Sequence, residues 1–292
     1  MLSLVLPKGS LEEGTMRLLE EADLAPQRKE ERDYKLSIDD PRIGQVRLLR
    51  PQEIPLYVEK GYFDLGITGW DWVVETGSEV VEVMTLFYNK SSFGRPVKIV
   101  LAVAESSPLE RAEDIPPGSR ISTEYPHLTE EFFARLGIAV EIYRSYGATE
   151  AKVPDIADAV VDITETGATF RRQGLKIIAT LLESTTKLIA NKESYADPQK
   201  RTEIEDIKTL LQGAIAARGK VLIKLNVREE DMEKVIEILP AAKSPTIAKL
   251  FGTGYYAVES VVPKKDINLL IPRLKQRGAE DILELPISKI VD

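Results

Sequence analysis

Short apolar runs alternate with segments of helical periodicity along most of this chain. The run "LSLVL" (residues 2–6) precedes "SLEEGTMRLLEEADL" (10–24), where apolar positions recur at helical spacing. The run "FDLGITG" (63–69) precedes "WDWVVETG" (70–77) in the same way. Strands that are separated by helices are typical of a parallel sheet with helices packed on it. The alternation therefore predicts an α/β fold.

Two helix starts carry recognisable signals. Ser10 and Glu13 have the spacing of a capping box, and Asp197 followed by Pro198 supplies a favoured cap and first-turn residue. The segment "LKIIATLLESTTKLIANK" (175–192) precedes the second helix and reads as a long return strand with a turn. We expect it to lead the chain back from a second series of strands and helices, which begins near residue 96.

The order of predicted strands and helices changes after residue 219. The segments "KVLIKLNV", "REEDMEKVIEIL", "TIAKLFG", "YYAVESVV", "KDINLLIPRLKQRG" and "EDILELPISKI" read as β-α-β-β-α-β. That order is the ferredoxin-like split βαβ unit. Residues 219–292 are therefore predicted to form a separate small domain.

Composition narrows the classes of function. A net charge of −8 argues against a general nucleic-acid binder, although it leaves room for an anionic ligand at a local site. Cysteine is absent and His127 is the one histidine, so neither thiol chemistry nor a histidine metal cluster is expected. No apolar run approaches the ~20 residues that span a bilayer, and the start of the sequence lacks a signal-peptide pattern. We expect a soluble, cytoplasmic protein that binds no membrane.

The stretch "DAVVDITETGATF" (158–170) carries the clearest functional pattern. Asp158 and Asp162 are four residues apart, so they point to the same face of a strand. Asp162 lies near the carboxyl end of that strand, where open α/β sheets place ligands. Residues 164–169 then offer threonine hydroxyls, backbone N–H groups and a glycine, which suit a phosphate. The pattern favours a sugar phosphate with the acid on ribose hydroxyls, and a plain capped strand-turn-helix is the alternative.

Three further turns could hold phosphates. Lys8 follows the first strand, Arg47 and Arg50 precede a helix, and Asp64 and Asp71 bracket a turn that contains Gly66 and Gly69. Taken singly, each is equally typical of an exposed or turn-forming residue. Together they favour one cleft for a polyphosphate between two domains. Trp70 and Trp72 are expected to pack, and His127 is given no chemistry.

Five segments resemble ATP phosphoribosyltransferase, in order along residues 4–192. They are "LPKGSL", "RLLRPQEIPLYVEKGYFDLGITGWD", "RISTEYPHLTEEFF", "SYGATEA" and "DAVVDITETGATF" with the following "QGL". The C-terminal "SPTIAKL" and "GAEDILELPISKI" resemble the regulatory domain of the family's long form. The resemblance implies a periplasmic-binding-protein-like catalytic core, with residues 1–94 and 180–215 in one domain and 95–179 in the other.

The same resemblance implies a reaction and its site. ATP and phosphoribosyl pyrophosphate (PRPP), with Mg²⁺, would give N1-(5-phosphoribosyl)-ATP and pyrophosphate, in the first step of histidine biosynthesis. Lys8 and Arg50 would act at the reacting groups. The PRPP residues would be Glu150, Asp158, Asp162, Thr164, Glu165, Thr166, Gly167, Ala168 and Thr169. The ATP residues would be Lys8, Gly9, Thr68, Gly69 and Asp71.

Regulation and assembly also follow from the resemblance. Histidine would inhibit from the C-terminal domain, where the hydroxyls of Ser244 and Thr246 could hold its polar ends, and dimers would assemble to hexamers. The metal ligands are left unassigned. Ser10 stands where many members of the family have arginine, and Arg95 and Lys98 are weaker candidates because their segment is less typical.

Two other classes of function compete with the transferase. A solute-binding protein has a similar hinged core, but it would normally carry a secretory signal and would not need residues 219–292. A catalytically inactive regulatory subunit is the third possibility. Lys8, Arg50, Asp162 and the "TGAT" loop are all present and argue against it.

Overall fold

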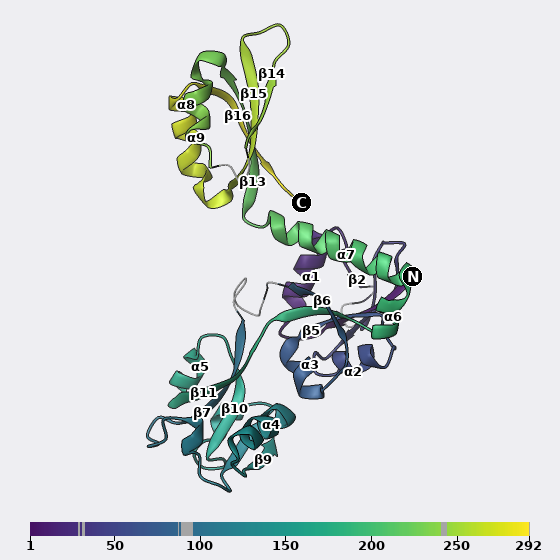
Figure 1. Cartoon of the computed structure of the whole chain (residues 1–292), viewed down its shortest axis with the longest axis vertical. Helices are drawn as coiled ribbons and strands as arrows, with labels where there is room; N and C mark the ends of the chain where they lie inside the picture. The colour runs from purple at the N-terminus through teal and green to yellow at the C-terminus, as the bar shows by residue number, and fades with distance from the viewer. Residues whose placement is uncertain (29, 31–32, 87, 89–95, 241–243, 292) are drawn as a thin grey trace. The chain divides into compact units, whose positions relative to one another are not determined.

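The computed structural model describes residues 1–28, 30, 33–86, 88, 96–240 and 244–291. The chain forms two compact units. One comprises residues 1–20 and 24–208 and is called the core unit below. The other comprises residues 21–23 and 209–292 and is called the C-terminal unit (Figure 1). Within the described residues, no helix is both long and apolar enough to cross a bilayer.

A seven-stranded mixed sheet forms the first lobe of the core unit, in the order β2-β3-β4-β1-β5-β12-β6. Its strands are β1 Leu2–Pro7, β2 Gln27–Arg28, β3 Lys35–Ser37, β4 Ile43–Leu49, β5 Leu65–Gly69, β6 Val81–Leu86 and β12 Thr186–Ala190. Its helices are α1 Glu12–Glu21, α2 Ile54–Glu59 and α3 Trp70–Thr76. β1 pairs in parallel with both β4 and β5, as the strand-helix alternation predicts.

A five-stranded sheet forms the second lobe, in the order β11-β7-β10-β8-β9. Its strands are β7 Val97–Ala104, β8 Arg120–Thr123, β9 Glu141–Arg144, β10 Ala159–Thr164 and β11 Leu175–Ser184. Its helices are α4 Pro126–Leu136, α5 Ala168–Arg172 and the 3₁₀ turns η1 Ala112–Asp114 and η2 Thr149–Lys152. β11 pairs with β7 up to Ser184, and β12 then joins the first sheet. The predicted return strand with a turn is confirmed, and the core has the expected two-lobed, periplasmic-binding-protein-like fold.

The C-terminal unit has the predicted β-α-β-β-α-β order. Its elements are β13 Lys220–Arg228, η3 Glu229–Asp231, α8 Met232–Ile236, β14 Thr246–Lys249, β15 Tyr255–Pro263, η4 Lys264–Asp266, α9 Ile267–Gln276 and β16 Ala279–Pro286. The sheet order β14-β15-β13-β16 is that of a ferredoxin-like fold. Buried residues alternate along β13, because one face of the sheet packs under α8 and α9 (Figure 1).

Helix α7 (Pro198–Ala217) starts where the sequence predicts, and α6 (Lys192–Ala196) precedes it. The Asp197 carboxylate accepts from the backbone N–H of Lys200 at 2.9 Å, which satisfies a free N–H of the first turn. At α1 the structure differs from the prediction. The helix begins at Glu12, whose carboxylate accepts from the Gly9 N–H at 3.2 Å, so the contact falls one residue earlier than the Ser10–Glu13 pair.

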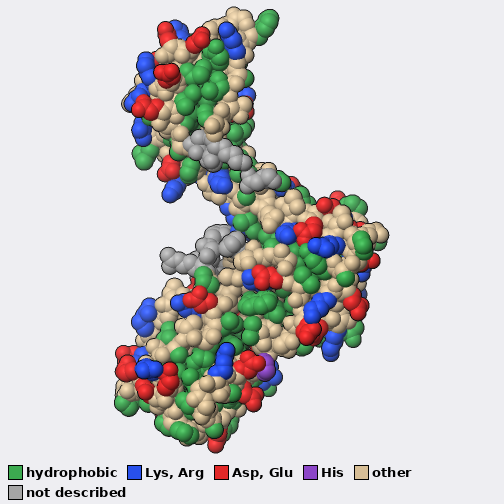
Figure 2. Space-filling view, in the orientation of Figure 1, with side chains coloured by type: hydrophobic (Ala, Val, Ile, Leu, Met, Phe, Trp, Pro, Cys, Tyr) green, Lys and Arg blue, Asp and Glu red, His purple; other side chains and the backbone are tan. Residues whose placement is uncertain are grey.

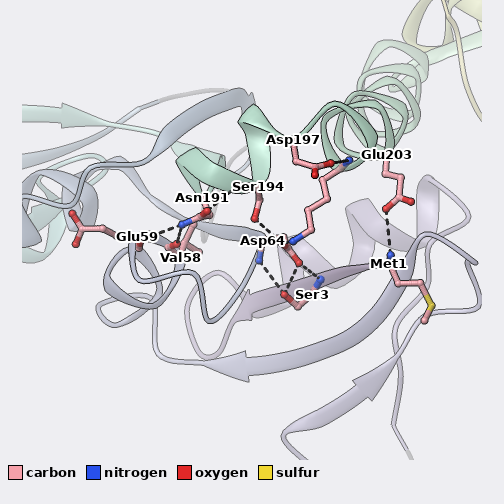
Figure 3. A network of polar contacts seen from close by, with 10 residues as sticks. Met1, Ser3, Val58, Glu59, Asp64, Asn191, Ser194, Asp197 and Glu203 are labelled. Atoms are coloured by element: carbon pink, nitrogen blue, oxygen red, sulfur yellow. Dashed lines mark hydrogen bonds and ion pairs between the residues drawn. The ribbon is translucent and has the colours of Figure 1, made fainter.

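A network of polar contacts centred on Asp64 fastens α6 and α7 to the first sheet (Figure 3). The carboxylate accepts from the Ser3 N–H and hydroxyl, both at 2.7 Å. It also accepts from Ser194 Oγ at 2.6 Å and Lys200 Nζ at 2.7 Å. Burial raises the pKa of Asp64, but these hydrogen bonds, led by that of Lys200, outweigh it and lower the pKa to about 2. Asp64 therefore holds β1, α6 and α7 together rather than lining a turn for a ligand.

Surface charge is mixed rather than gathered by sign. Figure 2 shows lysine and arginine side chains interspersed with aspartate and glutamate over the visible face. Buried aliphatic side chains form separate clusters in each lobe and in the C-terminal unit. These cores fix the sheets, whose strand ends carry the candidate site residues described next.

Candidate active site

Lys8, Gly9 and Arg50 meet at one edge of the first sheet. β1 and β4 run in parallel with Pro7 opposite Leu49, so the residues that follow both strands emerge side by side. The Lys8 N–H donates to the Leu49 carbonyl at 2.7 Å. Gly9 has φ +97°, and a Cβ there would lie 3.6 Å from Arg50 Nη1. The structure therefore brings together three residues that the sequence placed in one site.

Tyr34 is a member of this edge that the sequence pattern did not reveal. Lys8 Nζ donates to Tyr34 Oη at 3.0 Å and lies 4.1 Å from the centre of its ring. The hydrogen bond from Lys8, followed by its charge and that of Arg50, lowers the pKa of Tyr34. The Lys8 ammonium and the Arg50 guanidinium make this edge cationic, which suits an anionic ligand.

Thr68, Gly69 and Asp71 form the turn after β5, with their polar atoms engaged by the protein itself. Thr68 is fully buried and donates to the Pro51 carbonyl at 2.9 Å. A Cβ on Gly69 would lie 2.2 Å from Asp71 Oδ1, so a side chain there would displace the Asp71 carboxylate. Asp71 is 2% exposed and accepts from Ser184 Oγ at 2.6 Å and Tyr125 Oη at 2.9 Å. Their contact with ATP stays a prediction.

The same turn ties the two lobes. Burial raises the pKa of Asp71, against the hydrogen bonds from Ser184 and Tyr125, which come from β11 and the segment before α4. Trp72 stacks on Tyr125 with ring centres 4.5 Å apart, which confirms that Trp72 packs. The Glu75 carboxylate accepts from the His127 and Leu128 N–H groups at 3.1 and 2.9 Å, at the start of α4. Helix α3 of the first lobe is thus fixed against α4 of the second.

The loop after β10 holds its own shape. Thr164 Oγ1 accepts from the Gly167 N–H at 2.8 Å, and Thr166 Oγ1 accepts from the Ala168 N–H at 3.3 Å. Gly167 has φ +72° directly before α5, a conformation that disfavours any side chain. Arg171 Nη2 donates to the Thr166 carbonyl at 3.2 Å, which adds a cation that the sequence analysis missed. The predicted loop residues therefore form one compact turn.

Asp162 lies at the base of this loop among other carboxylates. Burial raises its pKa to about 6, with the charges of Glu124 and Glu150 acting in the same direction. The Ile163 N–H donates to its Oδ1 at 2.7 Å and, together with a hydrogen bond from Thr149, opposes the rise. The charge of Glu150 therefore acts on Asp162, and a shared role of the two in binding PRPP stays a prediction. Glu124 directly follows β8, and that position after a strand was the signal that could have found it.

Asp158 is not brought to the loop. It precedes β10, whereas residues 164–169 follow it, and a strand rises about 3.3 Å per residue. Its Oδ1 lies 2.8 Å from Arg120 Nη2, and its Oδ2 accepts from the Arg120 N–H at 2.8 Å. The hydrogen bonds from Arg120 lower the pKa of Asp158. The carboxylate fixes the start of β10 against β8, because two residues on one face can still lie at opposite ends of a strand.

The remaining candidates lie outside this cluster. Lys98 Nζ pairs with Glu183 at 3.2 Å, and Arg95 lies outside the described residues. The His127 side chain is exposed and lies 3.3 Å from Glu131. In the C-terminal unit, Ser244 and Thr246 are exposed, and β14 begins at Thr246 as the sequence predicts. Among the residues that the structure describes, no group of three histidine, aspartate or glutamate side chains could hold a metal ion.

The chain is similar to known proteins along almost its whole length. Residues 50–213 match the model of the ATP phosphoribosyltransferase family, and residues 217–289 match that of the HisG C-terminal domain. ATP phosphoribosyltransferases from Chlorobaculum parvum and Pelotomaculum thermopropionicum are 46% and 44% identical to this chain. The first alignment covers 100% of this chain and 98% of the relative, and the second covers 99% of each.

A solved structure supports the assignment of the core. It is the ATP phosphoribosyl transferase (HisG:HisZ) complex from Thermotoga maritima, with 27% identity and a TM-score of 0.61. The match covers 73% of this chain and 96% of that one. The family models, the full-length relatives and this fold agree, and the chain therefore belongs to the ATP phosphoribosyltransferase family, the transferases of histidine biosynthesis.

Proposed function

We propose that this chain joins PRPP to N1 of ATP and releases pyrophosphate, in the first step of histidine biosynthesis. The observation that carries the proposal is Asp162, which sits among carboxylates at a strand end beside a loop of hydroxyls and glycine. Its carboxylate would accept from the ribose hydroxyls of PRPP, and residues 164–169 would hold a phosphate. Membership of the family supports the choice of both substrates.

The chemistry requires positioning and electrostatics rather than a nucleophile from the protein. N1 of ATP would attack the anomeric carbon of PRPP while the bond from that carbon to the pyrophosphate oxygen breaks. The ribose gathers positive charge in the transition state, and pyrophosphate leaves with the electron pair. Asp162 and Glu150 would stabilise the positive ribose. Lys8 and Arg50 would stabilise the leaving anion and the phosphates of ATP.

Magnesium would enter with the substrate. The described residues offer no group of three histidine, aspartate or glutamate side chains that could hold a metal, which does not favour a resident site. Mg²⁺ prefers oxygen ligands, keeps several waters and is often bound through substrate phosphates. We therefore propose the Mg²⁺ complex of PRPP as the substrate form.

A pyrophosphate-release assay with ATP and PRPP tests the reaction. Release is expected only when both substrates and Mg²⁺ are present, together with a product that contains both the adenine and the ribose 5-phosphate. A solute-binding protein or an inactive subunit would bind a substrate without releasing pyrophosphate. Binding of PRPP with no turnover by the full chain would therefore overturn the proposal.

Removal of the cationic side chains tests the sheet edge. Lys8→Ala and Arg50→Ala should each lower kcat/KM at least about tenfold, because each loses a charge-assisted contact of about 1.5–3 kcal/mol. Folding should change little, because Arg50 is exposed and Lys8 is only partly buried. Lys60→Ala, an exposed lysine that follows α2, is the matched control. Unchanged kcat/KM in both variants would remove these residues from the site.

Regulation by histidine is the finer part of the proposal. Histidine would bind the C-terminal unit near Ser244 and Thr246 and inhibit allosterically, which needs a coupling of ~1–3 kcal/mol. Homo-oligomers, from dimer to hexamer, would carry this coupling. Ser244→Ala and Thr246→Val in the full chain should weaken histidine binding in calorimetry and leave PRPP affinity unchanged. Unaltered histidine affinity in both variants would place that site elsewhere.

The full chain is a better test than a truncation at residue 219. A Cβ on Gly213 of α7 would lie 3.1 Å from Val291 and 3.3 Å from Lys289. Arg218 also pairs with Glu21 at 2.7 Å. These contacts lie within the C-terminal unit, which includes residues 209–217 and 21–23. Removal of residues 220–292 would expose the part of α7 that these residues cover. A loss of activity could then reflect damage to the remaining chain rather than loss of the histidine-binding domain.

A further inference from the structure

Helix α4 of the second lobe receives its N-terminal cap from the first lobe. Its own N-cap residue, Tyr125, supplies no side-chain cap, and its first turn holds no acidic residue. The first N–H groups of a helix need acceptors from elsewhere, and a carboxylate suits them best. Glu75 of α3 provides both of its oxygens: Oε1 accepts from the His127 N–H at 3.1 Å, and Oε2 accepts from the Leu128 N–H at 2.9 Å. Glu75 is 9% exposed, so little water reaches this contact.

A second contact between the lobes lies one turn earlier on α3. The Asp71 N–H donates to Ser184 Oγ at 2.9 Å, and Tyr125 Oη donates to the Asp71 carboxylate at 2.9 Å. Ser184 ends β11, and the chain enters β12 of the first lobe two residues later. Glu75 follows Asp71 by four residues, so it lies on the same side of α3, about 6 Å further along the axis. A contact at the crossing alone leaves the lobes free to rotate about it, whereas a second contact one turn away restrains that rotation.

Both helices of this contact follow strands that adjoin the strands of the proposed site. α3 follows β5, which pairs in parallel with β1, and Lys8 directly follows β1. α4 begins shortly after β8, which pairs in parallel with β10, the strand of Asp162. The carboxyl ends of parallel strands lie at one edge of a sheet, so each helix starts beside one half of the site. The contact of Glu75 with α4 therefore links the two halves through short, regular elements.

We infer that Glu75 is a positioning residue, which fixes the angle between the lobes and thereby the spacing between the Lys8–Arg50 edge and the Asp162 loop. The inference rests on the proposed function, in which the two halves act on one reacting pair. A misplacement of about 1 Å can cost about a hundredfold in rate. In this role Glu75 contacts no substrate and acts through α4.

Distances between the lobes test the contact directly. The chain has no cysteine, so Lys60→Cys and Ser106→Cys together carry two spin labels, one on each lobe. Both positions are exposed. Pulsed dipolar spectroscopy then gives the distribution of label distances, and dilution with unlabelled chain restricts it to pairs within one chain. Glu75→Ala should broaden this distribution. Glu130→Gln, which alters an exposed carboxylate on α4, is the matched control and should leave it unchanged.

Glu75→Gln is the conservative variant. Its amide keeps the shape of the side chain but offers one acceptor oxygen instead of two, and its NH2 group would face an N–H. It should broaden the distance distribution less than Glu75→Ala does. It also keeps the test open if Glu75→Ala fails to fold, which circular dichroism and a melting curve would reveal.

Kinetics separate positioning from a loss of folded protein. Glu75→Ala should lower kcat by about ten- to a hundredfold, and Glu75→Gln by less. PRPP affinity and stoichiometry in calorimetry should stay unchanged, because the proposed PRPP residues all belong to the second lobe. A merely structural role would lower kcat and the PRPP stoichiometry together.

Each outcome bears on the inference. An unchanged distance distribution in folded Glu75→Ala and Glu75→Gln overturns it, and so does a broadened distribution with unchanged kcat. Equal falls in kcat and in PRPP stoichiometry also contradict it. The distance measurement uses no substrate, so it is independent of the reaction. If the wild-type chain releases no pyrophosphate from ATP and PRPP, the proposed function and the role of Glu75 in it both fall, whereas the contact itself is judged by the distances.

Discussion

Asp64 and Asp162 lie in different lobes of the core unit, and their surroundings shift their ionisation in opposite directions. Asp64 accepts four hydrogen bonds from Ser3, Ser194 and Lys200, and its pKa falls to about 2. Asp162 accepts from the Ile163 N–H, the charges of Glu124 and Glu150 act on it, and its pKa rises to about 6. Burial raises the pKa of both, so the number and charge of the donors decide the difference.

The comparison separates a structural carboxylate from one that awaits a ligand. The oxygens of Asp64 are supplied with donors by the fold itself, including a cation. Among the described residues, Asp162 keeps acceptor capacity beyond the hydrogen bond from the Ile163 N–H, next to a loop of hydroxyls. A ligand that brings hydroxyl donors or positive charge to Asp162 would relieve the repulsion from Glu124 and Glu150. A partly buried carboxylate with few donors from the protein is thus the better guide to a binding site.

Removal of the Asp162 charge should have the largest effect, and that effect should be on PRPP affinity. Asp162→Asn should weaken PRPP at least about tenfold, because a charge-assisted hydrogen bond contributes about 1.5–3 kcal/mol. ATP affinity should change far less. Calorimetric titration with each substrate measures both. Equal losses for ATP and PRPP would mean that the variant disturbs the fold rather than one ligand.

Asp64→Asn should instead lower stability, by on the order of 2 kcal/mol at neutral pH. The neutral amide leaves Lys200 without its buried partner and unfastens α6 from β1 (Figure 3). Urea unfolding followed by tryptophan fluorescence reports the right region, because Trp70 and Trp72 both lie in the core unit. Asp39→Asn, which alters an exposed carboxylate, is the control. PRPP affinity should stay unchanged in both variants.

In contrast, Asp162→Asn should stabilise the protein in the absence of ligands, by about 1–2 kcal/mol above pH 7. A raised pKa means that the folded state favours the protonated form, so ionisation costs stability as pH rises through about 6. The neutral amide avoids that cost. Urea midpoints can be measured for both proteins from about pH 5 to about pH 8. The midpoint of Asp162→Asn should diverge from that of wild type as pH increases. A constant difference would contradict the assigned charge state.

The pH dependence of Asp64→Asn should have the opposite form, and it is the smallest effect expected. The stability that Asp64 contributes is fully present above the ordinary aspartate pKa of about 3.9 and is lost only as pH falls toward 2. The difference between Asp64→Asn and wild type should therefore be flat between pH 5 and 8, within about 0.5 kcal/mol. A slope through pH 6 would mean that Asp64 titrates in that range.

The sequence was sufficient for much of the fold. Period-two alternation in residues 220–228 and helical spacing in 267–276 are local signals, and they predicted the βαββαβ unit. Asp197 and Pro198 located the start of α7 for the same reason. Lys8 and Arg50 were predictable as a pair, because each directly follows one of two strands that pair in parallel.

The rest depended on contacts between distant residues. The side-chain period places Asp158 and Asp162 on one face, but it does not reveal that Asp158 pairs with Arg120. The sequence placed Asp71 in a turn that could contact a ligand. In the structure, the hydroxyl of Ser184, 113 residues away, donates to one of its carboxylate oxygens. The hydrogen bonds of Lys152 could not be predicted from the sequence, because its two serine partners, Ser122 and Ser145, lie on other segments.

The position of β6 in the first sheet has a consequence for how the chain is made. β6 (Val81–Leu86) does not adjoin β5, because β12 (Thr186–Ala190) lies between them. During translation, β6 leaves the ribosome roughly 100 residues before its neighbour, a delay of about 5–20 seconds at usual rates of synthesis. The whole second lobe is synthesised in that interval. The first lobe can therefore be completed only after the second lobe has emerged, and the open edge of β5 needs protection from other chains until then.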